Sequence, residues 1–152
     1  PWLYAVLFLG KRVENRSRKD GRMPAMCNYR GPLLLHASKG FGGLGRFRGA
    51  LETIEVIVGA GAMDRMVADN YVDDSAWSPH PNMPRGGIVG RCNVVGVINP
   101  QGGGVVDNER HWVDLDMRWH IPGSYGLVLA DVEPLPFREC KGAQGLFDVE
   151  YS

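Results

Sequence analysis

Cysteine is scarce in this chain of 152 residues, and its three copies form no recognisable set. Cys27, Cys92 and Cys140 lie far apart in the sequence, and none of them belongs to a Cys-x-x-Cys pair. A disulfide-stapled framework or a zinc ribbon requires closely spaced cysteines, so both classes are excluded. The four histidines are scattered in the same way. We therefore expect reduced thiols in a cytoplasmic protein that binds no metal ion and no cofactor.

Long apolar runs are missing as well. The apolar stretch 2–9 is too short to cross a bilayer, because a spanning helix needs about 20 such residues. No small-residue cleavage site follows it, so it does not have the form of a signal peptide. We therefore expect no membrane partner. Because the chain begins at Pro1 rather than at Met, we also expect that a few residues before Pro1 are missing.

The sequence has no net charge either, because 17 Lys and Arg side chains balance 17 acidic ones. Their distribution is uneven: residues 1–50 hold ten Lys or Arg and two acids, whereas residues 51–152 hold seven and fifteen. A basic segment gains free energy by releasing counterions from phosphates, which favours a polyanionic partner such as RNA. The alternative is that the two oppositely charged parts pair with each other within the fold.

Glycine and proline, in contrast, are abundant, with 21 and 10 copies. So many turn-forming residues favour short strands joined by loops over a helical bundle. The apolar fraction of 44% is sufficient for one hydrophobic core in a chain of this length. We therefore expect a single α+β domain over residues 1–152, with about five strands and two or three helices.

Apolar periodicity and turn residues place these elements along the chain. The expected helices are 1–9, which opens on Pro1 and stops at Gly10, and a broken helix over 51–67. The expected strands are 13–17, 31–38, 86–98, 125–132 and 145–151. The expected connections are loops at 18–28, 39–49, 73–85 and 99–108, and a Pro-rich segment at 133–141. The glycines of 39–49 fit neither a P-loop nor a dinucleotide turn, so we expect a flexible loop there.

Lys11, Glu14 and Arg16 follow the first expected helix with the spacing Lys-x-x-Glu-x-Arg. These three residues belong to one of four stretches that are considered together: 1–2, 10–16, 30–37 and the ending formed by 124–132 and 146–151. Together, and in this order, they resemble the bacterial and phage branch of the ASCH domain family, within the PUA-like superfamily. The signature of that family has a Gly two residues before the Lys; Leu9 stands there, and Gly10 beside it relieves the turn.

The resemblance implies a fold and a ligand class. The fold is a small PUA-like β-barrel with flanking helices, and its cleft lies between the first helix, the signature loop and the barrel mouth. Related folds bind RNA or modified bases in that cleft. We therefore expect a module that binds RNA or a modified nucleobase beside the signature residues.

The chemistry of the signature agrees with such a ligand. Glu14 and Arg16 are two residues apart, so on a strand they face the same side, and Lys11 can lean over them from the preceding turn. One acid between two cations leaves positive charge for a phosphate, and the carboxylate can accept from the exocyclic amine of a base. The alternative is an ordinary solvated cluster of ion pairs.

Other side chains extend the expected binding surface. Trp2 at the start of the helix can stack on a base, or it can pack in the core instead. One of the other tryptophans, Trp77, Trp112 or Trp119, can form part of a base-binding wall. The expected basic contacts are Arg18, Lys19, Arg22 and Arg30. A different possibility is an interaction protein whose basic loop 18–30 meets an acidic partner.

Two enzymatic alternatives come with the resemblance. Some family members cleave single-stranded RNA without a metal, which requires a base, a cation and an acid. The candidates for these roles are Lys11, Glu14, Ser124 and Tyr125. Other members hydrolyse acylated cytidine with a Thr nucleophile three residues after the signature Lys. Glu14 occupies that position and cannot form the alkoxide, so the ribonuclease is favoured over the amidohydrolase.

Overall fold

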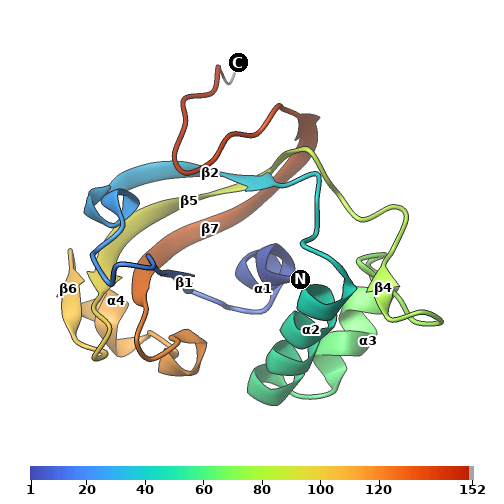
Figure 1. The fold of residues 1–152 in the computed structure, drawn as a ribbon, viewed down its shortest axis with the longest axis horizontal. Helices are drawn as coiled ribbons and strands as arrows, with labels where there is room; N and C mark the ends of the chain where they lie inside the picture. Colours follow the sequence, from blue (N-terminus) through green and yellow to red (C-terminus); the bar gives the residue numbers. More distant parts are fainter. Residues whose placement is uncertain (151–152) are drawn as a thin grey trace.

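The computed structural model describes residues 1–150, and these form an α+β fold around a five-stranded antiparallel sheet (Figure 1). The strand order is β1-β7-β5-β2, with β6 paired to β5 beside this path. The strands are β1 Val13–Arg16, β2 Gly31–Ala37, β5 Gly87–Ile98, β6 Gly104–Val106 and β7 Tyr125–Glu139. Because β1 and β2 are the two ends of this order, the sheet is open among the described residues.

The two central strands, β5 and β7, form most of the sheet and bend it. They pair from Ile98 opposite Gly126 to Gly87 opposite Glu139, with three shifts of register. Such irregularities raise the local twist and bend a strand. Figure 1 shows the two strands side by side in one long curved band. Two of the three shifts end at a glycine of β5, Gly90 and Gly96, which is where a strand bends most readily.

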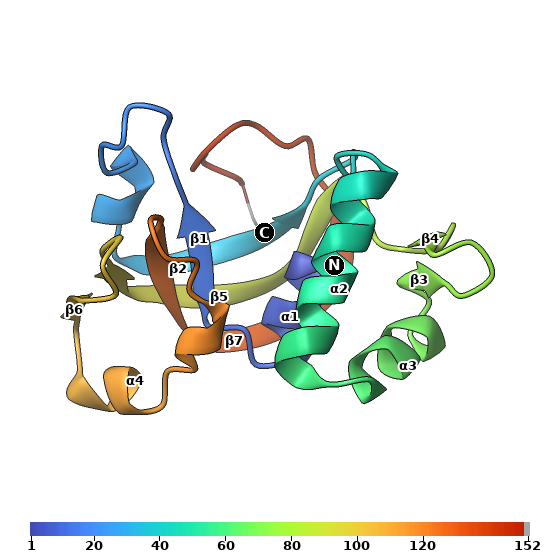
Figure 2. The same ribbon diagram turned by 60° about the horizontal axis from the view of Figure 1, so that its bottom comes forward.

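Helices gather at the two ends of this band. The three main ones are α1 Trp2–Phe8, α2 Leu44–Val58 and α3 Gly61–Ala68. α2 and α3 lie side by side with a small hairpin, β3 Val72–Asp73 and β4 Ser78–Pro79 (Figures 1 and 2). The opposite end carries the 3-10 helix η1 Ala25–Asn28, β6, helix α4 Glu109–Val113 and the 3-10 helix η2 Met117–Trp119. Within residues 1–150 no helix combines the length and apolarity needed to cross a membrane.

The apolar side chains form two clusters, and α1 contributes to both. Tyr4 belongs to the cluster that includes α2 and α3, whereas Val6 belongs to the cluster that includes η1 and β2. Side chains alternate along a strand, so neighbouring residues of β7 join different clusters. Val128 lies in the first cluster and Leu127 in the second. The middle of α1, residues 4–7, is therefore apolar around its whole circumference because it is buried between the two clusters.

The predicted α+β class is confirmed, and so are the helix at 1–9, the strands at 13–17, 31–38 and 86–98, and the break in the helix over 51–67. The predicted loop 39–49 is wrong from Leu44 onward, because α2 begins there. Phe47 in this first turn is buried in the core, and its packing outweighs the low helix propensity of the neighbouring glycines. The two-residue strands β3 and β4 and the short β6 were not predicted, since they lie inside expected loops.

The ending of the chain differs most from the prediction. The Pro-rich connection predicted at 133–141 is wrong, because β7 continues through it to Glu139. Beyond Val128 no described strand pairs with β7 on its β1 side, so Pro134 and Pro136 can stand there without breaking a ladder bond on that side. The strand predicted at 145–151 is wrong over 145–150, which form no strand. Residue 151 lies outside the described residues.

The packing of α2 leads to a stability prediction. Ile54 is fully buried among the side chains of α1, α3 and the sheet, whereas Val56 on the same helix is 85% exposed. Ile54→Ala should lower the free energy of unfolding by about 2–5 kcal/mol, because it leaves a cavity in the core. Val56→Ala should change it by less than about 0.5 kcal/mol. Urea denaturation measures both values, and equal losses would contradict the described packing.

Candidate functional site

The candidate site is built on β1, the short strand at one end of the sheet (Figure 2). After α1 ends, Gly10 turns the chain with a φ of +74°, a conformation that favours glycine, and β1 begins three residues later. The register pairs Glu14 with Leu127 and Arg16 with Tyr125. Opposite residues of an antiparallel pair point to the same face, so these four side chains share one face of the sheet.

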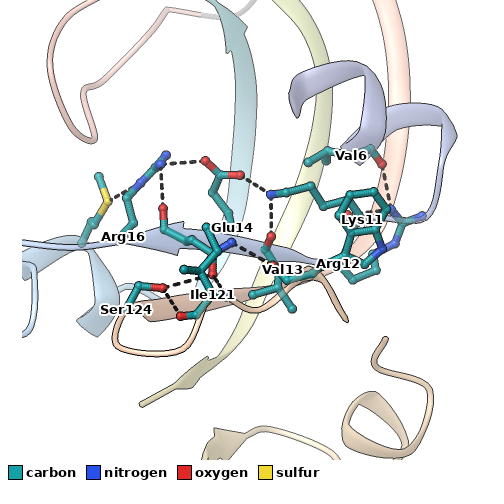
Figure 3. Close-up of polar contacts among 11 residues, drawn as sticks. Val6, Lys11, Arg12, Val13, Glu14, Arg16, Ile121 and Ser124 are labelled. Atoms are coloured by element: carbon teal, nitrogen blue, oxygen red, sulfur yellow. Dashed lines mark hydrogen bonds and ion pairs between the residues drawn. The ribbon is translucent and has the colours of Figure 1, made fainter. Parts of the chain in front are cut away.

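Lys11, Glu14 and Arg16 come together as the sequence predicted (Figure 3). The Lys11 Nζ lies 2.6 Å from the Glu14 Oε2, and the Arg16 Nη1 lies 2.6 Å from the Glu14 Oε1. Lys11 is only 3% exposed, whereas Arg16 is 41% exposed. The single carboxylate is thus shared by one buried and one accessible cation, and the cluster carries a net positive charge.

The direction of the β1 carbonyls follows from its pairing. The backbone N–H of Leu129 donates to the carbonyl of Arg12 at 2.9 Å, so this carbonyl points toward β7. Successive carbonyls of a strand alternate in direction, and therefore those of Val13 and Asn15 point away from β7. β7 is the only strand paired with β1 among the described residues. The Val13 and Asn15 carbonyls consequently face the free edge of the sheet.

Both of these edge carbonyls accept a hydrogen bond from the cluster. The Lys11 Nζ donates to the Val13 carbonyl, and the Arg16 Nη1 donates to the Asn15 carbonyl at 3.2 Å (Figure 3). The N–H group of a strand residue points to the same side as its carbonyl, so the Asn15 N–H also faces outward. The cluster therefore occupies the acceptors of the edge and leaves its donors available, which discourages pairing with another strand.

The Lys11 ammonium is fully occupied by its surroundings. Besides its bonds to Val13 and Glu14, it lies 5.9 Å from the centre of the Trp2 ring, within range of a cation–π interaction. Trp2 is thereby brought to the cluster, as the sequence predicted, and it remains 37% exposed. Lys11 is best described as a positioning residue, and Arg16 as the cation that a ligand can reach.

The surroundings of Glu14 keep its carboxylate ionised. Burial by itself would raise the pKa of Glu14, but the charges of Lys11 and Arg16 and the hydrogen bonds that they donate outweigh it. The pKa of Glu14 is therefore lowered from its ordinary value of 4.5. A carboxylate with a lowered pKa is a weak proton acceptor, so this group is better suited to fixing the two cations than to general base catalysis.

Arg16 also connects β1 to the next segment of the chain. Its Nε donates to the Met26 Sδ at 3.1 Å, and Met26 belongs to η1, which precedes β2. Tyr125 stands opposite Arg16 on β7 and is half-buried on the same face. The structure therefore brings Tyr125 close to the accessible cation, in a position where its hydroxyl or ring can contact a ligand.

Ser124 is not brought to the cluster. Its Oγ donates to the Ile121 carbonyl at 2.6 Å and lies 3.2 Å from the Asn15 Oδ1 (Figure 3). The Asn15 side chain lies on the face of β1 opposite to Glu14, because the two residues are adjacent in a strand. The Ser124 hydroxyl thus holds the turn that precedes β7 and does not face the Glu14 carboxylate.

Two residues of the signature stretch make structural hydrogen bonds that were not predicted from the sequence. The Arg12 Nη1 donates to the Val6 carbonyl at 2.7 Å and so caps the end of α1. The Asn15 side chain donates to the Trp119 carbonyl at 2.8 Å and accepts from the Ile121 N–H at 3.0 Å. A cation just after a helix end was a usable signal for Arg12. Asn15 gave no comparable signal, since its partners lie more than a hundred residues later.

The basic loop after β1 is only partly available for a ligand. Arg18 pairs with Asp20 at 2.8 Å, and both are exposed. Arg30 donates from its Nη1 to two backbone carbonyls at and just after η1, so it helps to fix this segment. Lys19 and Arg22 are exposed, and neither has a carboxylate partner for its side chain in the described chain. These two are the exposed cations of the loop that no carboxylate of the described chain neutralises.

The remaining candidates lie elsewhere. Trp119 is 3% exposed in the core, so the idea that it forms a base-binding wall is wrong, whereas Trp77 is exposed in the β3–β4 hairpin and Trp112 is exposed on α4. His36 is hydrogen-bonded to the Cys140 carbonyl at 2.9 Å. No group of three or more His, Cys, Asp or Glu side chains in residues 1–150 is arranged to hold a metal ion.

Two cavities of the described residues also lie outside the cluster. One of about 560 Å³ opens on β2, β5 and β7, beside Leu34, Arg91 and Asp131. The other, of about 340 Å³, lies between α2 and the β3–β4 hairpin. The cluster lines neither of them. The candidate site is therefore an accessible strand edge and not part of these cavities.

No protein-family model matches the chain, and no curated protein matches it. The resemblance to the ASCH family therefore stays a prediction, and the function has to be argued from the geometry of the cluster.

The lowered pKa of Glu14 leads to a prediction about pH. Its carboxylate should stabilise the fold fully above pH 4.5, and this contribution should be lost as the pH falls through the lower folded-state pKa. Glu14→Gln leaves the buried Lys11 without its counter-charge. The difference in unfolding free energy between the native protein and Glu14→Gln should therefore be largest at neutral pH and shrink in acid.

Asp20→Asn is the matched control for this experiment. Asp20 also pairs with an arginine at 2.8 Å, but both partners are exposed, so the pair contributes little. Chemical denaturation at several pH values measures all three proteins. A Glu14→Gln difference that stays constant between pH 7 and acid, or that only equals the Asp20→Asn difference, would contradict the proposed role of Glu14.

Proposed function

We propose that this chain is an ASCH-type module of the PUA-like superfamily that binds RNA, or a modified nucleobase, at the free edge of β1. One observation carries the proposal. The edge carbonyls of Val13 and Asn15 are both taken by the cations of the cluster, so the edge offers donors and positive charge. A ligand that matches it is rich in acceptors and negatively charged.

A phosphate group meets these requirements. Its oxygens accept hydrogen bonds, and outward-facing backbone N–H groups with a nearby guanidinium form a common kind of anion site. Arg16 is 41% exposed and uses its Nη1 and Nε on neighbours, while its Nη2 donates to no described residue. This nitrogen and the Asn15 N–H are the donors proposed to contact the phosphate.

A longer anion than a single phosphate is supported by the distribution of charge. The first 50 residues hold ten Lys or Arg against two acids, and two of these cations, Lys19 and Arg22, lie in the loop that follows β1. Contacts of this kind are additive along a nucleic acid backbone, because each releases counterions. We therefore propose RNA as the ligand class, with the β1 edge holding one of its phosphates.

Recognition of a base is proposed to come from the aromatic groups beside the cluster. Trp2 is 37% exposed and contacts the Lys11 ammonium, and Tyr125 lies on the face shared by Glu14 and Arg16. Stacking of a base on such a ring contributes about 1–3 kcal/mol. The Glu14 carboxylate, although held by two cations, retains lone pairs that can accept from an exocyclic amine.

The PUA-like barrel is part of the same proposal. The curved sheet, with its three register shifts between β5 and β7, supports it. So does the contact of Arg16 with Met26, which connects the β1 end of the open sheet to the segment that leads into β2 at the other end. A single domain over residues 1–152 belongs to this proposal as well.

A metal-independent ribonuclease is the second candidate, and the position of Tyr125 beside Arg16 is the observation in its favour. The contacts of the cluster favour binding over cleavage. Lys11 is buried, and its ammonium group already interacts with Val13, Glu14 and Trp2, so it is not available to a reacting phosphate. The pKa of Glu14 is lowered, which makes its carboxylate a weak general base. The amidohydrolase is the least supported, because Glu14 stands where a hydroxyl nucleophile is required.

Binding of short single-stranded RNA should depend on Arg16 and on salt. Arg16→Ala should lower the affinity about tenfold or more, because a charge-assisted hydrogen bond is lost. It should also make the dependence of log affinity on log salt shallower by about 0.7, the value for one phosphate contact on a single strand. Fluorescence anisotropy over a salt series measures both quantities.

Arg91→Ala is the matched control for the RNA experiment. Arg91 is also an exposed arginine with a carboxylate partner, Glu133 at 2.6 Å, but it lies on β5 away from the cluster. Its replacement should leave the affinity within about twofold. Absence of RNA binding, binding that ignores salt, or equal losses for the two variants would each overturn the proposal.

Turnover should be tested separately. RNA incubated with the native protein in a chelator should be recovered intact, because the cluster is argued to bind rather than to cleave. Gel electrophoresis of the RNA, beside Lys11→Ala and Tyr125→Phe, measures this. Cleavage that disappears in both variants would establish the ribonuclease instead, and cleavage that survives in both would point to a contaminating enzyme.

A further inference from the structure

A second site is formed between α2 and the β3–β4 hairpin. The cavity there has a volume of about 340 Å³ and is lined by Arg48, Glu52, Ser75, Ala76 and Trp77. It lies at the α2–α3 end of the molecule, whereas β1 and the basic loop lie at the other end (Figure 2). The cavity is therefore independent of the proposed RNA edge.

Trp77 is held at this cavity in an unfavourable backbone conformation. Its φ is +48°, which is rare for a residue with a bulky side chain, and the ring is 43% exposed. Arg48 fixes the turn, because its Nε donates to the Trp77 carbonyl at 3.1 Å and its Nη2 donates to the Ala76 carbonyl at 2.9 Å. A helix side chain thus keeps a partly exposed indole at the wall of a cavity.

The Glu52 carboxylate forms no ion pair with Arg48, because Arg48 donates to the hairpin carbonyls instead. Glu52 stands one helical turn after Arg48, a spacing at which the two side chains would ordinarily pair. Arg48 is instead turned toward the hairpin carbonyls, and no described cation lies within ion-pair distance of the Glu52 carboxylate. The cavity therefore combines an accessible carboxylate with the face or edge of an indole ring.

The surroundings of the cavity are acidic. Residues 44–83, which form α2, α3 and the hairpin, hold six acidic side chains and three basic ones, and one of the basic side chains, Arg48, lines the cavity itself. Two of the acids, Asp73 and Asp74, lie in the hairpin beside the cavity. A concentration of negative charge of this kind attracts cations to the cavity and repels RNA from it.

We propose that this cavity binds the cationic side chain of a lysine or arginine presented by a basic peptide segment of a partner protein. The indole of Trp77 would supply a cation–π contact and Glu52 the counter-charge, which is how proteins hold ammonium and guanidinium groups. The cavity is small and open, so it accommodates one side chain rather than a folded ligand. Nothing in this proposal depends on RNA binding at β1.

Fluorescently labelled hexalysine and hexaarginine peptides test the proposal with the full chain. Trp77→Ala and Glu52→Gln should each weaken binding of at least one peptide about threefold or more, the effect of one exposed cation–π contact or ion pair. Trp112→Ala and Glu109→Gln are the matched controls, since they remove an exposed Trp and an exposed acid on α4. Both controls should stay within about twofold of the native affinity.

The controls distinguish a site from general attraction to an acidic surface. If Glu109→Gln weakens binding as much as Glu52→Gln, or if Trp77→Ala has no effect, the proposal is overturned. Circular dichroism of each variant verifies that it is folded. RNA binding by Trp77→Ala, measured in parallel, should equal that of the native protein, so that failure of this proposal and failure of the RNA proposal give different results.

Discussion

The Glu14 carboxylate accepts one hydrogen bond from the Lys11 ammonium and one from the Arg16 guanidinium, at 2.6 Å each. These two ion pairs to one carboxylate fix the exposed end of the sheet. Because Glu14 holds both cations, each can also reach one outward carbonyl of β1. β1 is only four residues long and pairs on one side, so these bonds replace part of the missing ladder. Without the carboxylate, Lys11 would be a buried cation without a counter-charge, which is costly.

The same two ion pairs determine what the edge can bind. Because Lys11 and Arg16 donate to the outward carbonyls of β1, the outward N–H groups of β1 and the accessible nitrogen of Arg16 remain for a ligand. The edge therefore favours an anion over a further strand. Trp2 adds aromatic surface beside Lys11, and Tyr125 adds it opposite Arg16. A structural role at the sheet end and a role in ligand binding are therefore carried by the same three charged side chains, with Lys11 positioning and Arg16 exposed.

Much of the fold and of this cluster could be predicted from the sequence, because the features are local. The spacing of Glu14 and Arg16 predicted a shared face, and helix 1–9 was evident from its breakers. β7 was cut short in the prediction, since its prolines are acceptable only where no second strand pairs, and that depends on the whole sheet. The masking of the Val13 and Asn15 carbonyls could not be predicted either, because it depends on which side of β1 receives β7. Ser124 was placed near the cluster by its position before a strand, yet its hydroxyl holds a turn on the other face.

The proposed contact between the β1 edge and a phosphate can be measured by amide chemical shifts during a titration with short single-stranded RNA. The largest shifts are expected at the Asn15 backbone N–H and at the Trp2 indole, with the Trp77 and Trp112 indoles unchanged. Shifts confined to Trp77 or Trp112, or a saturating titration that leaves Asn15 and Trp2 unmoved, would contradict it.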